Sequence, residues 1–226
     1  MANGRLQTLD RGIEVLLLLA RTPGGLKVGE LATRLDLHRA AAYRIVATLA
    51  DHGMVQRTDG GRVILGPGAY LLGAHAGDSL RDLARPVLED LAERTGATAF
   101  LSMAQGGECV VVLTAEPQEA FLNIHYRVGT RHPIDRGAAG IAILATRPEQ
   151  PDDPEDVRFA RAHGYSVTRG QLQKGAVGVS SAVDLAGGGF SGMEFSVGVV
   201  ALEDLDLERA PDAVRAAARK LSGTLG

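Results

Sequence analysis

The residues best suited to contact a nucleic acid lie in one short stretch, HRAAAYRIVATLADHG, at residues 38–53. If this stretch is a helix, its buried apolar stripe consists of Ala42, Ile45, Val46 and Leu49. The opposite face then carries the candidate DNA contacts, namely His38, Arg39, Ala40, Tyr43 and Arg44. Small residues let a helix approach a surface closely, and arginine side chains bind phosphate oxygens or guanine edges. The pattern predicts a DNA-reading helix, for which an ordinary solvated helix face is the alternative.

The elements predicted on either side of this stretch match those of a winged helix-turn-helix. Apolar residues at helical spacing predict two shorter helices before it, at residues 9–20 and 28–35. After it, two short apolar runs flank TDGG, which is a strong signal for a β-hairpin. A hairpin that follows a recognition helix is a wing, and Arg57 and Arg62 lie on either side of its tip. We therefore predict a winged helix-turn-helix over residues 1–66, in which both arginines contact the DNA backbone.

Beyond this region the sequence indicates a second, mixed domain. A linker over residues 67–78 is predicted to contain a helix at 68–76, and the second domain, residues 79–226, is predicted to open with a helix at 79–94. Alternating or continuous apolar runs then predict strands at 99–105, 107–116, 120–129, 165–168, 177–185 and 195–202. Further helices are predicted at 137–145, 157–163 and 211–221. The fold class is therefore α+β, with an antiparallel sheet flanked by helices.

Composition and charge restrict the class of protein. With 226 residues, 45% hydrophobic and 23% charged, the chain is long enough for two packed domains and too apolar to be disordered. Residues 1–75 carry nine Lys and Arg against six Asp and Glu, whereas the remainder carries fifteen against twenty-one. A basic first part joined to an acidic second part favours a DNA-facing module with a separate partner.

The sequence lacks the usual signs of catalysis, metal binding, nucleotide binding and export. Cys109 lies among valines, as a buried structural thiol would, and a single cysteine fits a reducing cytoplasm. His125 and His132 have no convincing third ligand, so we expect no metal site. Ser180 and Ser181 lack a GxSxG elbow, and the glycine-rich stretches lack GxGxxG or a Walker lysine, so we expect neither a catalytic residue nor a cofactor. No apolar run reaches the length of a membrane span.

Over nearly its whole length the chain resembles the IclR family of bacterial transcriptional regulators. In the first domain the resemblance rests on LQTLDRGIEVLLLLA, LATRLDLHRAAAYRIVATLADHGMVQR and VILGPGAYLLG. In the second it rests on VGTRHPIDRGAAGIAILA, GYSVTRGQLQKGAVGVSSAV and VRAAARKLSGTLG. The resemblance implies a winged-helix DNA reader joined by a linker helix to a GAF/PAS-like effector domain. It also implies a homodimer, commonly a dimer of dimers, on a palindromic operator.

The resemblance further implies where a small-molecule effector binds. Matched by position, the family's effector pocket corresponds here to Met103, Ala138, Ala139, Gly140, Arg169, Gly178, Ser196 and Gly198. Several family members carry Asp, Cys and Ser where this chain has Arg169, Gly178 and Gly198. These exchanges predict a different ligand, either larger or anionic. Family members also often carry Ser-Thr where this chain has Ala40 and Ala41, so we expect a different operator sequence.

Three functional interpretations follow. The leading one is a cytoplasmic, ligand-responsive regulator of transcription that binds double-stranded DNA and a small metabolite and has no catalytic role. The second is a constitutive or architectural DNA-binding protein whose sensor domain binds no ligand. The absence of side chains at Gly178 and Gly198 leaves this interpretation open. The third is a small-molecule enzyme with an incidental helical head, which would need a catalytic group that the sequence does not show.

Overall fold

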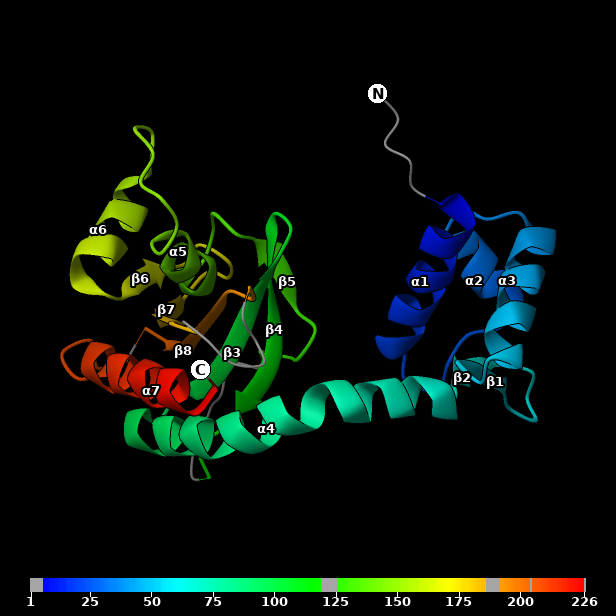
Figure 1. The fold of residues 1–226 in the computed structure, drawn as a ribbon, viewed down its shortest axis with the longest axis horizontal. Helices are drawn as coiled ribbons and strands as arrows, with labels where there is room; N and C mark the ends of the chain where they lie inside the picture. The colour runs from blue at the N-terminus through cyan, green and yellow to red at the C-terminus, as the bar shows by residue number, and fades with distance from the viewer. Residues whose placement is uncertain (1–5, 119–125, 186–191, 204, 226) are drawn as a thin grey trace. The chain divides into compact units, whose positions relative to one another are not determined.

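The computed structural model describes residues 6–118, 126–185, 192–203 and 205–225, with the backbone alone at residues 74–79. The chain divides into two compact units, one ending at Asp78 and the other beginning at Ser79. Figure 1 shows helices and a small hairpin in the first unit and a sheet with helices on both faces in the second. The α+β fold class predicted from the sequence is confirmed.

The first unit is a winged helix-turn-helix, as predicted. Its helices are α1 (Gln7–Ala20), α2 (Val28–Arg34) and α3 (Arg39–Asp51), and its wing consists of β1 (Val55–Arg57) and β2 (Val63–Leu65). One apolar cluster joins all five elements, and the residues at its centre are Val15, Leu31, Ala42, Val46, Val55 and Val63. Because this cluster fixes the inner face of α3, the opposite face of α3 is left to solvent.

The wing is also attached to the loop between α1 and α2. Leu26 forms a β-bridge with Val63, with its amide nitrogen 3.0 Å from the Val63 carbonyl oxygen. A Cβ atom at Gly25 would lie 2.1 Å from that same oxygen, and Gly25 has a φ angle of 70°. Only glycine allows both this close approach and this backbone conformation. The attachment holds the base of the wing beside α2.

A single helix, α4 (Pro67–Thr95), replaces the two helices predicted at 68–76 and 79–94. The prediction of a break was wrong because the stretch between them contains no proline. The glycines in this region each cost about 1 kcal/mol relative to alanine, which is not enough to end a long helix. The boundary between the two units therefore falls within a continuous helix.

The second unit is built on a six-stranded antiparallel sheet in the order β5-β4-β3-β8-β7-β6. The strands are β3 (Thr98–Gln105), β4 (Glu108–Ala115), β5 (Arg131–Pro133), β6 (Ser166–Arg169), β7 (Ala176–Val183) and β8 (Phe195–Leu202). The helices are α5 (Ala138–Leu144), α6 (Glu155–His163) and α7 (Ala210–Leu225). In Figure 1, α4 and α7 cover one side of this sheet, and α5 and α6 lie on the other.

The two faces of the sheet differ in character because side chains alternate along each strand. The face under α4 and α7 is strongly apolar, with Leu101, Val179, Val197 and Val199 almost fully buried. The face under α5 carries smaller and polar residues that are paired across neighbouring strands. These residues include Ser102, Ser180, Ser196, Gly198, Gly178 and Thr168. The second face leaves room for groups other than its own side chains.

One predicted strand is not found where it was expected. The strand predicted over 120–129 falls partly outside the described residues, and its described end, 126–129, is loop and turn. The strand that pairs with β4 is instead β5, three residues long, with Cys109 opposite His132. Apolar alternation alone could not place this strand, because RHP has no apolar pattern of its own.

Candidate nucleic-acid interface and effector cavity

Helix α3 presents its predicted DNA-contacting residues to solvent. It begins after His38, whose extended backbone (φ −61°, ψ 137°) ends the preceding turn. Ala42, Ile45 and Val46 are buried against the core. The five predicted contacts on the other face are all exposed, namely His38, Arg39, Ala40, Tyr43 and Arg44. The helical period therefore gives the orientation that the sequence predicts.

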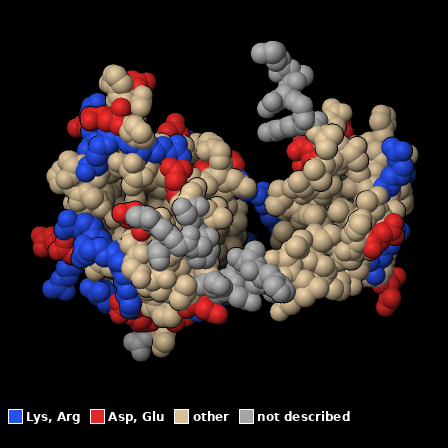
Figure 2. All heavy atoms as spheres, viewed as in Figure 1, with Lys and Arg blue, Asp and Glu red and all other residues tan. Residues whose placement is uncertain are grey.

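A basic concavity of about 620 Å³ lies between α2, α3 and the wing. Its residues include Lys27, Arg39, Tyr43 and Arg57, with glycines 60 and 61 at the tip of the wing. The Arg57 guanidinium lies 5.8 Å from the centre of the Tyr43 ring, which is a cation–π distance. In Figure 2 basic and acidic groups of this unit both lie along the edge where Figure 1 places α3, whereas the face over α1 carries few charges. Three cations, a hydrogen-bonding ring and the single carboxylate of Glu30 thus line one hollow among the described residues.

Gly29 shapes one side of this concavity. A Cβ atom at this position would lie 3.1 Å from Nη2 of Arg39, so the guanidinium lies directly against the first turn of α2. Lys27 stands just before the same turn, and its amide nitrogen donates to the Glu30 carboxylate at 2.7 Å. The prediction from sequence did not include Lys27. Its position beside a helix start was visible, but its distance from Arg39 was not.

The remaining predicted arginines lie elsewhere. Arg62 donates from Nε and Nη2 to the Gly25 carbonyl oxygen at 3.2 and 2.9 Å and also pairs with Glu30 at 3.7 Å. Its guanidinium is therefore bound within the protein and fixes the wing to the α1–α2 loop. Arg44 is exposed on α3, but it lines a separate apolar groove of about 870 Å³ beside α1. The structure thus groups Arg39, Tyr43 and Arg57 and leaves Arg44 to one side.

The second unit contains a cavity of about 280 Å³ on the sheet face under α5. Three predicted effector contacts line it, Ala138, Ala139 and Gly178. A Cβ atom at Gly178 would lie 3.3 Å from that of Ala138, so the start of α5 rests close to β7. Lining residues that the resemblance did not indicate are Phe100, Tyr126, Thr130, Arg131, His132, Thr168, Gln171, Leu172, Gln173, Ala176 and Val200.

Two predicted contacts point away from this cavity. Met103 lies on β3 with the residues that face α4 and α7, and it packs against that apolar core. Arg169 is exposed at the end of β6, and its neighbour Thr168 lines the cavity instead. A shift of one residue along a strand moves a side chain to the other face. Matching the sequence to the family's motifs could not decide which of Thr168 and Arg169 faces the cavity.

Three other predicted contacts are packed beneath or beside the cavity. A Cβ atom at Gly140 would lie 2.1 Å from the Ile134 carbonyl oxygen. A Cβ atom at Gly198 would lie 2.7 Å from Cζ of Phe100, whose ring fills the space that the glycine leaves. Ser196 is fully buried, and its hydroxyl has no hydrogen-bond partner among the described residues. The missing side chain at Gly198 therefore does not enlarge the cavity, contrary to the expectation of a larger ligand.

A hydrogen-bonded pair forms one wall. Nε2 of His132 lies 3.1 Å from the Tyr126 hydroxyl, and Nδ1 lies 2.9 Å from the Pro133 carbonyl oxygen. The Tyr126 ring meets Phe100 edge-on, with ring centres 5.0 Å apart. Burial raises the pKa of Tyr126 above its ordinary value, so its phenol stays protonated. Burial also raises the pKa of the neighbouring Cys109 to about 11, which keeps that thiol unreactive.

The loop between β6 and β7 closes another side. Gln171 accepts a hydrogen bond from the Gly137 amide at 2.9 Å and donates to the Asp156 carboxylate at 2.9 Å. Leu172 packs over Gly137, where a Cβ atom would lie 2.5 Å from its Cδ1. Nη2 of Arg136 also donates to the Gln171 carbonyl oxygen, so hydrogen bonds and an apolar contact together hold the loop against the start of α5.

Within the described residues, no group of three or more His, Cys, Asp or Glu residues is arranged to hold a metal ion. His125 lies outside the described residues. No helix in the part of the chain that the structure describes is long and apolar enough to cross a membrane.

These features define a winged-helix DNA-binding protein with a cavity in its second unit, and comparisons with known proteins agree with the fold. The family model for the IclR helix-turn-helix domain matches residues 8–59, and that for the bacterial transcriptional regulator IclR C-terminal domain matches residues 74–153. The chain is 30% identical to the HTH-type transcriptional regulator BhcR of Paracoccus denitrificans, across 97% of this chain and 88% of that one. The chain belongs to the IclR family.

Further relatives support this assignment. The transcriptional repressor IclR of Escherichia coli is 26% identical across 66% of this chain and 56% of its own length. Among solved structures, the regulator from Alicyclobacillus acidocaldarius has a TM-score of 0.82 at 24% identity, covering 98% of this chain and all of that one. An IclR homologue from Microbacterium hydrocarbonoxydans, complexed with 4-hydroxybenzoate, has a TM-score of 0.79 at 20% identity, covering 96% of this chain and 98% of that one. The protein is therefore a DNA-binding transcriptional regulator of this family.

Proposed function

We propose that this regulator binds its operator through the concavity formed by Lys27, Arg39, Tyr43 and Arg57. The convergence of three exposed cations with Tyr43 beside α3 carries this proposal. In winged-helix proteins the recognition helix enters the major groove, where arginine contacts phosphates and guanine edges. Lys27 and Arg57 stand on either side of that helix, so they are placed to bind the phosphates that border the groove.

The two wing arginines give a matched test. Arg57 lies over Tyr43 in the concavity, whereas Arg62 is bound to the Gly25 carbonyl oxygen within the protein. We expect Arg57→Ala to weaken DNA binding and to reduce the slope of log affinity against log salt by about one, as loss of one phosphate contact does. We expect Arg62→Ala to lower the melting temperature of the first unit instead. An unchanged salt slope for Arg57→Ala would remove Arg57 from the interface.

The cavity under α5 is the proposed effector site. A volume of about 280 Å³ suits a small metabolite, and walls contributed by Phe100, Tyr126 and Val200 are apolar or aromatic. The 4-hydroxybenzoate found with the Microbacterium homologue is a ligand of that size class. Because this cavity adjoins the loop at Gln171 and the start of α5, a ligand that prefers one arrangement of these elements shifts their equilibrium. Coupling to DNA needs only about 1–3 kcal/mol of differential affinity.

The test of this assignment is a panel of metabolites added during DNA binding. The panel contains short 2-oxo acids, aromatic acids including 4-hydroxybenzoate, and phenols. We expect one class to change operator affinity and to raise the melting temperature of the second unit. A response in neither measurement would favour the alternative in which the sensor domain binds no ligand.

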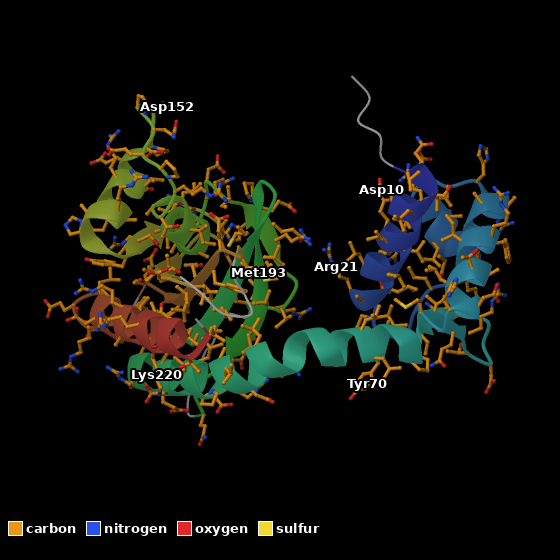
Figure 3. The ribbon with its side chains drawn as sticks, viewed as in Figure 1. Asp10, Arg21, Tyr70, Asp152, Met193 and Lys220 are labelled. Carbon is orange, nitrogen blue, oxygen red and sulfur yellow. The ribbon has the colours of Figure 1, made fainter. Side chains whose placement is uncertain are left out.

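A homodimer on a palindromic operator completes the proposal. Leu6, Leu9 and Ile13 on or beside α1 and Tyr70 and Leu72 on α4 are exposed apolar side chains. Tyr70 projects away from α4 in Figure 3 and is 77% exposed. Large apolar side chains left exposed to solvent are typical of subunit contacts. Sedimentation of the full chain tests this, with Tyr70→Ser combined with Leu72→Ser as the variant expected to weaken self-association.

A further inference from the structure

One polar pair in the wall of the effector cavity has a hydrogen-bond direction that follows from a neighbouring carbonyl oxygen and the tautomer that it selects. His132 is 6% exposed, and its Nδ1 lies 2.9 Å from the Pro133 carbonyl oxygen. A carbonyl oxygen only accepts hydrogen bonds, so Nδ1 carries the proton. In the neutral ring Nε2 is therefore an acceptor.

The tautomer of His132 sets the hydrogen-bonding role of the Tyr126 hydroxyl. Its hydroxyl lies 3.1 Å from Nε2 of His132, and since Nε2 accepts, the phenol donates its only proton to it. The phenolic oxygen can then accept a hydrogen bond from a third group but cannot donate one. Tyr126 and His132 both line the cavity, so this acceptor lies at its wall. The raised pKa of Tyr126 keeps the proton in place.

The remaining walls define what else a ligand must offer. Phe100 stands edge-on to Tyr126 and presents an aromatic surface beside it. Among the described residues that line the cavity, the only Lys or Arg is Arg131, and no Asp or Glu is present. Arg131 is paired with Glu108 at 2.9 Å and also donates to Gln105, so its charge is already compensated. The cavity therefore suits an uncharged, flat group next to the Tyr126 acceptor.

We propose that Tyr126, oriented by His132, is the specificity-determining residue of the cavity and accepts a hydrogen bond from the hydroxyl of a small phenol. This inference rests on the proposed role of the cavity as the effector site. A ligand that offers only an acceptor at the same place, such as an ether, brings two oxygen lone pairs together. It also loses a hydrogen bond to water without replacing it.

Three uncharged probes of nearly the same shape test the inference on the full-length protein. They are 4-methylphenol, which donates, 4-methylanisole, which only accepts, and toluene, which does neither. We expect calorimetric titration to show 4-methylphenol binding about tenfold more tightly than either of the others, the difference that one buried hydrogen bond makes. Tyr126→Phe retains the ring and removes the oxygen, so the three affinities should come within about twofold of one another.

Two further variants complete the design. Tyr165→Phe changes a tyrosine of the same unit that does not line the cavity, so it should keep the tenfold preference. His132→Leu removes the acceptor for the Tyr126 proton, which frees that hydroxyl to donate. In this variant 4-methylanisole should gain relative to 4-methylphenol, a change that simple loss of packing would not produce.

Equal binding of the three probes to the native protein would overturn the inference, and so would a preference that survives Tyr126→Phe. Failure of 4-methylphenol to bind at millimolar concentration would overturn it too. The outcomes separate it from the proposed function. If a 2-oxo acid alters DNA binding while the phenol does not bind, the effector role stands and the phenol class is wrong. If the phenol binds with the Tyr126-dependent preference but no ligand alters DNA binding, the inference about Tyr126 is supported. The proposed role of the cavity in regulation is then contradicted.

Discussion

In the first unit the proposed functional side chains are exposed and lie on α3, on the hairpin and just before α2, whereas in the second unit the cavity is lined by several strands of a sheet and by α5. Arg39 and Tyr43 are one helical turn apart in the sequence, but Phe100 and Thr168 come from strands on either side of β8 and β7. The exposed site depends on local periodicity, and the enclosed site depends on strand register. The two sites therefore respond differently to substitution and are predictable to different degrees.

The largest expected effect is on the packing of the enclosed site. Gly198→Val places atoms against the Val179 carbonyl oxygen, 2.4 Å from an ideal Cβ, and against the Phe100 ring. We expect it to destabilise the second unit by about 3 kcal/mol, as overpacking of a well-filled core does. Thermal unfolding measures this. Gly223→Ala is the control, because nothing lies within 4 Å of that position in α7 and alanine favours a helix. If both variants melt like the native protein, the sheet is not packed as described.

The next effect concerns the exposed site, where affinity should change without a change in stability. Arg39→Ala should weaken operator binding by about 2 kcal/mol, within the range for one phosphate or base contact. Fluorescence anisotropy at a stated salt concentration measures it. Arg21→Ala is the control, since Arg21 follows the last residue of α1 and does not line the concavity (Figure 3). Equal losses in the two variants would mean that binding senses only net charge.

A smaller effect on ligand affinity tests which residue of β6, Thr168 or Arg169, faces the cavity. Thr168→Val preserves the shape of the side chain and removes its hydroxyl from the cavity wall, so it should weaken the binding of a polar effector by about 1 kcal/mol. Arg169→Ala should leave that affinity unchanged, because Arg169 does not line the cavity. Thermal-shift titration with the ligand found in the panel distinguishes them. The opposite ranking would restore the role that the family resemblance implied for Arg169.

The smallest effect is a dependence of stability on alkaline pH. The pKa of Cys109 is raised to about 11 by burial, so the folded state retains a proton that the unfolded state releases near pH 9. The contribution to stability is complete below that range and is lost as pH rises from about 9 towards 11. Between pH 8 and 9.5 the loss should be less than about 1 kcal/mol. Denaturant unfolding measures it, and Cys109→Ala should flatten this part of the profile. An equally steep profile in the variant would assign the effect to other groups.

The sequence predicts the exposed site well for a physical reason. A helix repeats every 3.6 residues, so the burial of Ala42, Ile45 and Val46 by itself orients Arg39 and Tyr43 outward. The sequence could not show which side chains from different elements lie close together in space. Arg62 and Arg57 look equivalent beside TDGG, yet only the fold shows that Arg62 is bound to the carbonyl oxygen of Gly25.

The enclosed site was only partly predictable. Ala138, Ala139 and Gly178 were found through family resemblance, because small residues mark the close approach of α5 to β7. Phe100 and Tyr126 were missed because aromatic residues in apolar runs are expected to be core. The choice between Thr168 and Arg169 requires the pairing of Thr168 with Gly178, and no local pattern specifies that register.

The most direct test of the account is footprinting of the full-length protein on the DNA upstream of its own gene, with the metabolite panel added, for the native chain and for Gly178→Leu. The leucine fills the cavity next to Ala138 and Thr168 and lies in a different unit from α3. We predict that both proteins protect the same stretch of DNA and that one metabolite changes the protection only in the native chain. A native protein that ignores every metabolite, or a Gly178→Leu variant that still responds, would contradict the claim that this cavity controls DNA binding.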